Sequence, residues 1–225
     1  PFNLPTDSLV QGDNVLAVEV HQITTSSSDI VFGMTLDGIR QIPDPASLNI
    51  APMILDVRHD PKIPTSAESV AVTARLLDEH ADGFTGILHY RIDGATSFSS
   101  LTMTDDGLHG DGSAGDGLYG AIIPPWPDNT VVEFYLEAID SEGNTRTWPA
   151  PSLVDGTPEQ ATNLLYQIDD DFSADWIPGQ QPVYYMIMTE AERAELADIG
   201  DDGEWDGEAS SNAQMNATFI SVDGT

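Results

Sequence analysis

Cysteine is absent from this chain of 225 residues, and lysine occurs once, as Lys62. The lack of cysteine excludes disulfide scaffolds, cysteine-ligated zinc sites and thiol catalysis. Positive charge is scarce in general, because 7 Lys+Arg stand against 38 Asp+Glu and give a formal net charge of -31. We therefore expect no nucleic-acid partner, since phosphate backbones are bound through Lys and Arg. Attraction to anionic membrane surfaces is not expected for the same reason.

Long apolar runs are also missing. No stretch approaches the roughly 18 apolar residues that a membrane-spanning helix needs, so we expect no membrane insertion. Hydrophobic residues nevertheless make up 40% of the chain and aromatic residues 8%, which is enough for packed cores. Ordered domains with a very acidic surface suit a saline or calcium-rich exterior, where cations screen the self-repulsion. The composition thus favours an extracellular or cell-surface location.

The middle of the chain has the pattern of a β-sandwich. Short runs of β-forming residues recur about every ten residues, separated by Asp, Gly, Pro and Ser, with no helical period. The predicted strands are residues 53–57, 69–76, 85–92, 97–103, 118–123, 131–139 and 145–148. The sequence therefore predicts a mainly β fold, with an immunoglobulin-like or fibronectin type III-like β-sandwich over residues 52–151. It lacks the Cys…Trp…Cys pattern of disulfide-pinned domains.

The segments around this sandwich differ in composition from it. Two strand-like runs lie within residues 1–40, and their sequence "NVLAVEVHQ…SSDIVFGMTL" resembles the closing strands of a galactose-binding-type jelly roll. The resemblance implies a partial jelly roll there. Residues 41–51 are a proline-rich linker by composition, and residues 152–181 are predicted as an acidic linker.

Residues 182–225 predict a strand, a helix and a second strand. The run from Pro182 to Met188 is rich in β formers, and Thr189 is a suitable N-cap for the helix that follows, with Glu192 three residues on. A further strand is predicted from Ala217 to Val222. We interpret this β–α–β order as the opening of a third, partial domain. For residues 1–40 and 182–225 we expect exposed apolar surface or disorder.

The sharpest local feature is a loop of Asp and Gly between two predicted strands. Its carboxylates are Asp105, Asp106, Asp111 and Asp116, and the last three recur every five residues, each followed by Gly. Hard cations such as Ca²⁺ bind several carboxylate and carbonyl oxygens, so the crowding predicts a calcium site. The alternative is a tight glycine-rich connection in which Asp side chains cap turns. His109 lies in the same loop, but calcium rarely binds imidazole.

Other chemistry has little support. No G-x-S-x-G, P-loop or G-x-G-x-x-G fingerprint occurs, and the histidines are scattered, so we expect them at the surface or at strand edges. Those outside the acidic loop are His21, His59, His80 and His89. Trp126 and Trp148 flank predicted strands, where tryptophan either stacks on sugar rings or closes the ends of a sandwich core.

Two longer stretches resemble known proteins. The segments "VAVTARLLDEHADGFTGILHYRIDG", "MTDDGLHGDGSAGDGLYGAIIP" and "VVEFYLEAIDSEGNTRTWPAP" resemble the Ig-like module of large secreted bacterial proteins. The segment "PVYYMIMTEAERAEL…SNAQMNATFISVDGT" resembles the start of the spore-coat protein H (CotH) kinase family. That resemblance implies the first elements of an atypical kinase-like N-lobe, in a family thought to phosphorylate Ser on secreted targets with ATP and a divalent metal.

The resemblance carries no catalytic or cofactor-binding residue onto this sequence. The family's nucleotide-binding lysine, catalytic aspartate and metal ligands correspond to positions after Thr225, and Lys62 lies within the predicted sandwich. We therefore expect a non-catalytic accessory and spacer region of a large secreted or cell-surface bacterial protein, whose full-length form is a CotH-type kinase. The alternative is a carbohydrate-binding or adhesive sandwich, with a glycan or another protein as its partner.

Overall fold

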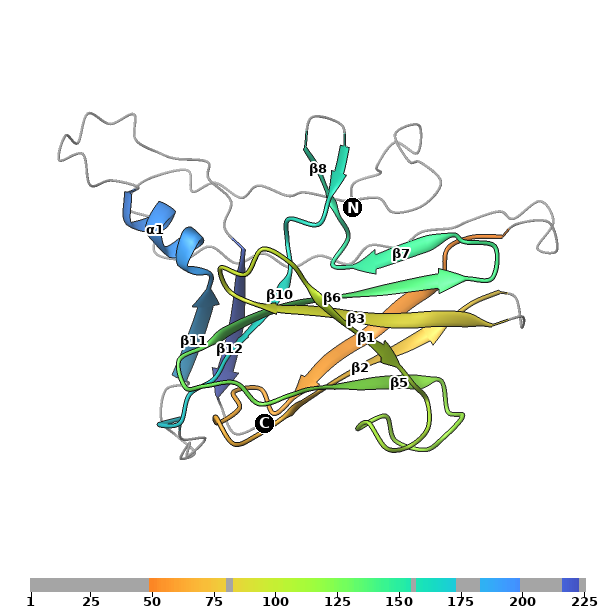
Figure 1. Ribbon diagram of the computed structural model, residues 1–225, viewed down its shortest axis with the longest axis horizontal. Helices are drawn as coiled ribbons and strands as arrows, with labels where there is room; N and C mark the ends of the chain where they lie inside the picture. Colours follow the sequence, from red (N-terminus) through yellow and green to blue (C-terminus); the bar gives the residue numbers. More distant parts are fainter. Residues whose placement is uncertain (1–48, 80–82, 155–156, 173–182, 199–215, 223–225) are drawn as a thin grey trace, which may run out of the picture. The chain divides into compact units, whose positions relative to one another are not determined.

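The computed structural model describes residues 49–79, 83–154, 157–172, 183–198 and 216–222 (Figure 1). All of these from Ala51 onward belong to one compact unit. The predicted jelly-roll remnant and most of the proline-rich linker lie outside the described residues. The account below concerns the unit from Ala51.

The described residues are mainly β, as the sequence predicts. The strands are β1 (Met53–Asp60), β2 (Val70–Leu77), β3 (Phe84–Ile92), β4 (Ser99–Met103), β5 (Leu118–Ile123), β6 (Val131–Asp140), β7 (Thr145–Trp148), β8 (Ser152–Val154), β9 (Thr157–Glu159), β10 (Leu164–Gln167), β11 (Val183–Met188) and β12 (Ala217–Val222). The helix α1 spans Glu190–Asp198. Strands β1 to β7 correspond to the seven predicted strands, and β5 and β7 match the predicted bounds.

Two antiparallel sheets form the sandwich (Figure 1). One has the order β1-β2-β5, and the other has the order β10-β6-β3-β4 with β7 also paired to β6. Strand β3 pairs with β6 along nearly its whole length. Strands β10 and β7 pair with successive halves of β6, over Val131–Phe134 and Leu136–Ile139 respectively. The predicted β-sandwich is confirmed.

The main core lies between the two sheets. Alternate residues of each strand point inward, because side chains in a strand have a period of two. Their exposed fractions are close to zero in the central strands, such as 0% for Val72, Leu88 and Phe134. The buried members are Ile54, Val70, Val72, Ala74, Leu76, Leu88, Tyr90, Met103, Ala121, Ile123, Val132, Phe134, Leu136, Ala138, Tyr166 and Ile168. Trp126 packs against this cluster, as expected for a residue that closes a core end.

The segment after residue 151 differs from the predicted linker. It contains the hairpin β8–β9 and strand β10, and β10 completes the five-stranded sheet. Strand β10 has only four residues, of which three are apolar, so its period gives little signal. Both Leu165 and Tyr166 are nevertheless fully buried, because each face of β10 is covered. Beyond it, Asp170 accepts hydrogen bonds from the Ser66 amide (2.6 Å) and hydroxyl (2.7 Å).

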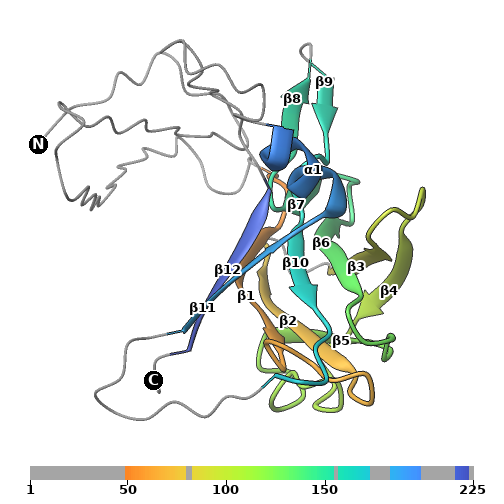
Figure 2. The same ribbon diagram turned by 90° about the vertical axis from the view of Figure 1, so that its left-hand side faces the viewer.

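The last two strands form a separate antiparallel ribbon, β11–β12, beside β10 (Figure 2). Its inner face carries Ile187 and Ile220, which pack with Val131 and Leu165 in a second, smaller core. Helix α1 follows the ribbon's first strand. The predicted N-cap is present, since the Thr189 hydroxyl accepts a hydrogen bond from the Glu192 amide at 3.2 Å.

His59 lies on the edge strand β1 and is half-buried among aromatic rings. The imidazole of His59 stacks on the ring of Tyr166, with centroids 5.6 Å apart, and meets Phe134 edge-on at 5.8 Å. Burial among these rings lowers the pKa of His59 from 6.5 to about 4, because the charged imidazolium is poorly solvated there. Its Nε2 lies 3.1 Å from the Lys62 carbonyl oxygen, to which the neutral ring donates.

This shift predicts a pH-dependent stability. The unfolded state takes up a proton near pH 6.5 and the folded state only near pH 4, so the contribution of His59 is complete above pH 6.5 and is lost as the pH falls toward 4. Between pH 7 and 4.5 the loss is up to about 2 kcal/mol. His59→Phe keeps an aromatic ring on Tyr166 but cannot titrate. Thermal melting across this range should show a shallower pH slope for the variant, and equal slopes would contradict the assignment.

Candidate functional site

The acidic loop between β4 and β5 contains a short internal repeat. The sequence Asp-Gly-Leu-His-Gly at residues 106–110 returns ten residues later as Asp-Gly-Leu-Tyr-Gly at residues 116–120. In each copy the Asp side chain accepts a hydrogen bond from the amide of the Leu two residues on. The distances are 2.9 Å for Asp106 to Leu108 and 2.9 Å for Asp116 to Leu118. Each copy is therefore an Asp-capped turn of the kind that Asp favours.

The glycine that follows each of these aspartates is required by the turn. Gly107 has a φ of 75° and Gly117 a φ of 82°, in the left-handed region that residues with a Cβ adopt at a cost. The Asp-Gly dipeptide thus places two successive amides on the concave side of the turn. Such paired amides form a site for an anion.

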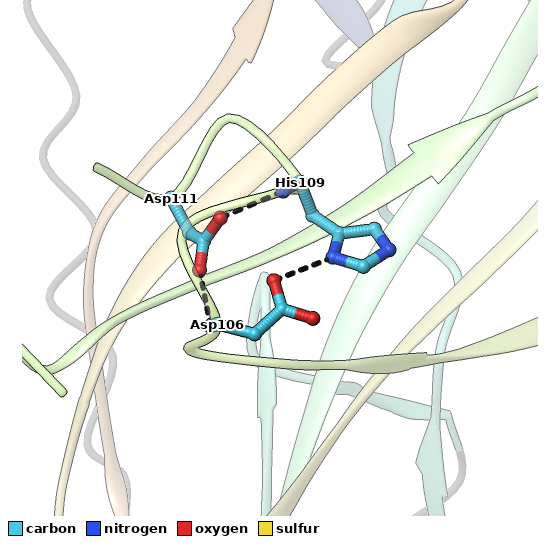
Figure 3. A group of neighbouring side chains, drawn as sticks. All are labelled: Asp106, His109 and Asp111. Carbon is cyan, nitrogen blue, oxygen red and sulfur yellow. Dashed lines mark hydrogen bonds and ion pairs between the residues drawn. The ribbon is translucent and has the colours of Figure 1, made fainter. Parts of the chain in front are cut away.

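In the first copy that anion is the side chain of Asp111 (Figure 3). Its Oδ2 accepts hydrogen bonds from the amides of Asp106 (2.7 Å) and Gly107 (2.8 Å), and its Oδ1 accepts one from the amide of His109 (2.7 Å). The Asp111 side chain has no exposed surface. A buried carboxylate requires such donors, because leaving it unpaired away from water is costly.

In the second copy the anion is the side chain of Asp105. Its Oδ1 accepts from the amide of Gly115 at 2.6 Å, and its Oδ2 accepts from the amide of Gly117 at 2.8 Å. The two turns therefore stabilise each other. Asp105, which precedes the first turn, accepts hydrogen bonds from amides of the second turn, and Asp111, which lies between the turns, accepts them from amides of the first. The end of the loop is tied to β2, where Arg75 donates to the Asp116 carbonyl oxygen at 3.0 Å.

The hydrogen bonds also set the protonation of the carboxyl groups. Burial by itself raises the pKa of Asp111, but the amide donors together outweigh it and hold the pKa below its ordinary value. A hydrogen bond from the His109 ring, at 2.9 Å, is the main cause that lowers the pKa of Asp106. The amides of Leu118 and Ser113 lower the pKa of Asp116. These three aspartates stay ionised at mildly acidic pH.

Three side chains are placed where they could hold a metal ion. Asp106, His109 and Asp111 each present one ligand atom, and these atoms lie within 4.8 Å of one another (Figure 3). The other two predicted ligands, Asp105 and Asp116, are not part of this group, because their carboxylates bind other amides. A mixed set of two carboxylates and an imidazole suits a borderline cation such as Zn²⁺ better than calcium.

The geometry supports the turn-capping alternative. The carboxylates of Asp105, Asp111 and Asp116 are engaged by backbone amides, and Asp106 is engaged by an amide and an imidazole. The carboxylates thus have hydrogen-bond donors within the loop itself, and the calcium hypothesis stays a prediction. Sequence reasoning placed His109 outside the site. The ten-residue repeat is the signal that predicts the paired turns.

No family matches the sequence, and no curated protein has significant similarity to it. Within the part of the chain that the structure describes, no helix has the length and apolar character that a membrane crossing requires.

Asp111→Asn tests the buried carboxylate. The amide side chain keeps the shape but presents an NH₂ group to backbone donors, so the variant should unfold more readily by about 1–3 kcal/mol for each buried amide left unpaired. Urea denaturation measures this loss. Asp116→Asn is the matched control, because this carboxylate accepts two amides at an exposed position and its loss should be smaller.

Calcium separates the two interpretations of the loop. If the aspartates only cap turns, added calcium leaves the melting temperature of the unsubstituted protein unchanged relative to chelator. An increase in the melting temperature that Asp106→Asn abolishes would instead favour a bound cation.

Proposed function

We propose that this chain is a non-catalytic accessory and spacer region of a large secreted or cell-surface protein, the full-length form of which is a CotH-type kinase. In this proposal the β-sandwich fixes the position of the kinase-like domain that begins with β11. The observation that carries the proposal is the shared core between the sandwich and the β11–β12 ribbon. The resemblance of the ribbon sequence to the start of the CotH family supports a kinase-like neighbour.

The shared core joins residues far apart in the chain. Val131 at the start of β6 and Leu165 in β10 form its sandwich side, and Ile187 and Ile220 form its ribbon side. Val131, Leu165 and Ile187 are 5%, 0% and 4% exposed, so the contact excludes water. Burial of the aliphatic side chains in this shared core contributes roughly several kcal/mol to the free energy that holds the ribbon against the sandwich.

Polar contacts fix the orientation of the ribbon. The Leu165 amide donates a hydrogen bond to the Thr218 hydroxyl at 3.0 Å, so the ribbon satisfies a backbone donor of β10. Just beyond the same end of the ribbon, the Glu190 amide at the start of α1 donates to Asp93, in the β3–β4 connection, at 2.7 Å. Two directional bonds beside an apolar contact favour one orientation over a loose attachment.

The outer face of the ribbon carries exposed apolar side chains, and these are evidence for the proposed larger neighbouring domain. Tyr184, Met186 and Phe219 are 57%, 62% and 63% exposed, and the rings of Tyr184 and Phe219 stack at 5.1 Å. Helix α1 is likewise solvent-exposed along most of its length, with Leu196 at 44%. A two-stranded ribbon and a nine-residue helix are marginal alone. Apolar surface of this kind is expected where a further layer of the same domain packs.

Ile187→Ala tests the docked ribbon. Truncating this buried side chain should cost about 2–5 kcal/mol at the shared core and release the ribbon from the sandwich. Hydrogen exchange is the measurement: the amides of β11 and β12 should lose protection while those of β2 and β3 keep theirs.

Met186→Ala is the matched control for this experiment. Its side chain lies on the opposite face of the same strand and is mostly exposed, so exchange in the ribbon should stay unchanged. Loss of protection throughout the sandwich in Ile187→Ala, or no loss anywhere, would contradict a docked spacer.

A carbohydrate-binding role is the second candidate, and one observation favours it. Trp148 at the end of β7 is 47% exposed, whereas Trp126 is packed against the core. An exposed indole offers a flat apolar surface that fits a sugar ring. This candidate requires binding of a glycan by the sandwich itself, which a spacer does not show.

Trp148→Ala distinguishes the two candidates. A glycan array probed with the full chain should show no retention if the chain is a spacer. Binding that is at least about tenfold weaker in Trp148→Ala, but unchanged in Phe219→Ala, would establish the carbohydrate role, since loss of an aromatic stacking contact costs about 1 kcal/mol or more.

A further inference from the structure

The open part of the five-stranded sheet holds a hydrogen-bonded row of three side chains. They are Ser100 on β4, His89 on β3 and Glu137 on β6. Ser100 and His89 are direct partners in the β3–β4 register, and Glu137 lies on the neighbouring strand across from Ile87, two residues from His89. All three side chains lie on the face of the sheet that points away from the main core. Their strand neighbours Leu88 and Leu136 point to the other face and are buried in that core.

The three side chains form a continuous chain of hydrogen bonds. The Ser100 hydroxyl lies 2.9 Å from Nδ1 of His89, and Nε2 of His89 lies 2.9 Å from a carboxylate oxygen of Glu137. A carboxylate only accepts hydrogen bonds, so Nε2 of the neutral ring carries the proton and donates it to Glu137. The Nδ1 lone pair is then left to accept the hydroxyl proton of Ser100.

The surroundings hold this imidazole in place. Its ring stacks on Tyr135 with centroids 4.5 Å apart and planes 13° from parallel, and Phe98 packs edge-on against Tyr135 at 5.0 Å. The side chains of His89 and Glu137 are only 15% and 26% exposed. Ser100 is exposed, so the base is shielded while the hydroxyl faces solvent.

The neighbouring charges leave Glu137 free for the histidine. Arg91, two residues along β3, forms a two-pronged ion pair with Glu133, at 3.0 Å for each contact. Glu133 also accepts from Asn163 at 3.0 Å, and the guanidinium lies over the Phe98 ring at 4.4 Å. Arg91 is thus held by Glu133 and by the Ala95 carbonyl oxygen, to which it donates at 3.2 Å.

We propose that Ser100 is a nucleophilic serine that accepts acyl or phosphonyl groups from activated esters and fluorides, with His89 as its general base and Glu137 as a positioning residue. A nucleophile, a base within hydrogen-bond reach and a third group that orients the base form the arrangement that activates serine. The ring nitrogens exchange roles relative to the chymotrypsin arrangement, in which the carboxylate binds Nδ1. Phe98, two residues before Ser100 and just before β4, offers apolar surface for the organic part of the reagent, and Tyr135 packs against both Phe98 and His89.

The reaction transfers one group and one proton. The Ser100 oxygen attacks the carbonyl carbon or the phosphorus, and its proton passes to Nδ1 of His89, giving an imidazolium that Glu137 stabilises. With an ester, the bond to the alcohol oxygen breaks and the alcohol leaves with the proton from Nδ1. With a fluorophosphonate, the P–F bond breaks, fluoride leaves, and the proton passes to solvent. No oxidant or further reactant is needed.

The test uses the full chain and a fluorophosphonate probe, with labelling followed at each serine by peptide mass spectrometry. Ser99 is the internal control, because it is an exposed neighbour on the same strand but has Tyr90 rather than a histidine opposite. We expect Ser100 to be labelled at least about tenfold faster than Ser99, since general-base assistance contributes about a hundredfold or more where it operates fully. His89→Gln should reduce labelling of Ser100 to the rate of Ser99.

Glu137→Gln keeps the shape of the positioning residue and provides a second test that does not depend on the folding of the His89 variant. An amide can present either its oxygen or its NH₂ group to Nε2, so the tautomer is no longer fixed and labelling should fall severalfold. Equal melting temperatures for the variants and the unsubstituted protein establish that the fold is kept. Equal labelling of Ser99 and Ser100, or labelling of Ser100 that neither substitution changes, would overturn the proposal.

Discussion

Burial of β6 on both faces is the constraint on which the rest of the described unit depends. Its first four residues are all buried, so this stretch has a core on each side. Val132 and Phe134 point into the sandwich, and Val131 points into the smaller core with the ribbon. The same strand is hydrogen-bonded to β3 along one edge and to β10 and β7 along the other. A change in β6 therefore reaches both sheet-to-sheet packing and ribbon docking.

The outer face changes character along β6, and this change separates two roles. At Val131 the face is apolar and covered by the ribbon, and at Glu133 it holds a charge that Arg91 and Asn163 satisfy. From Tyr135 onward its outward-facing residues are half-buried, and they include Glu137 of the hydrogen-bonded row that contains His89. Along β6, Val131 therefore takes part in docking the ribbon, whereas Glu137 takes part in the row that contains His89 and Ser100.

The sequence predicted the sandwich because alternation is a local signal, as in the strand of Val70, Val72 and Ala74. Strand β10 was not predicted, because four residues are too few to show a period and their burial depends on contacts with residues distant in the sequence. The acidic loop was located by composition, but its pairing was not. That Asp111 binds the amides of Asp106 and Gly107, and that Ser100 meets His89, depends on three-dimensional closure and strand register.

The hydrogen bonds between Ser66 and Asp170 have a consequence for protein engineering. They connect the β1–β2 turn to the chain that leaves β10, and the Asp169 amide adds a bond to the Pro64 carbonyl at 2.9 Å. An excised module that stops at residue 151 therefore loses this closure together with β10, and leaves half of one edge of β6 without partners. Unpaired sheet edges invite association with other chains. The smallest transplantable unit accordingly extends past Asp170, nearly twenty residues beyond the boundary that composition suggests.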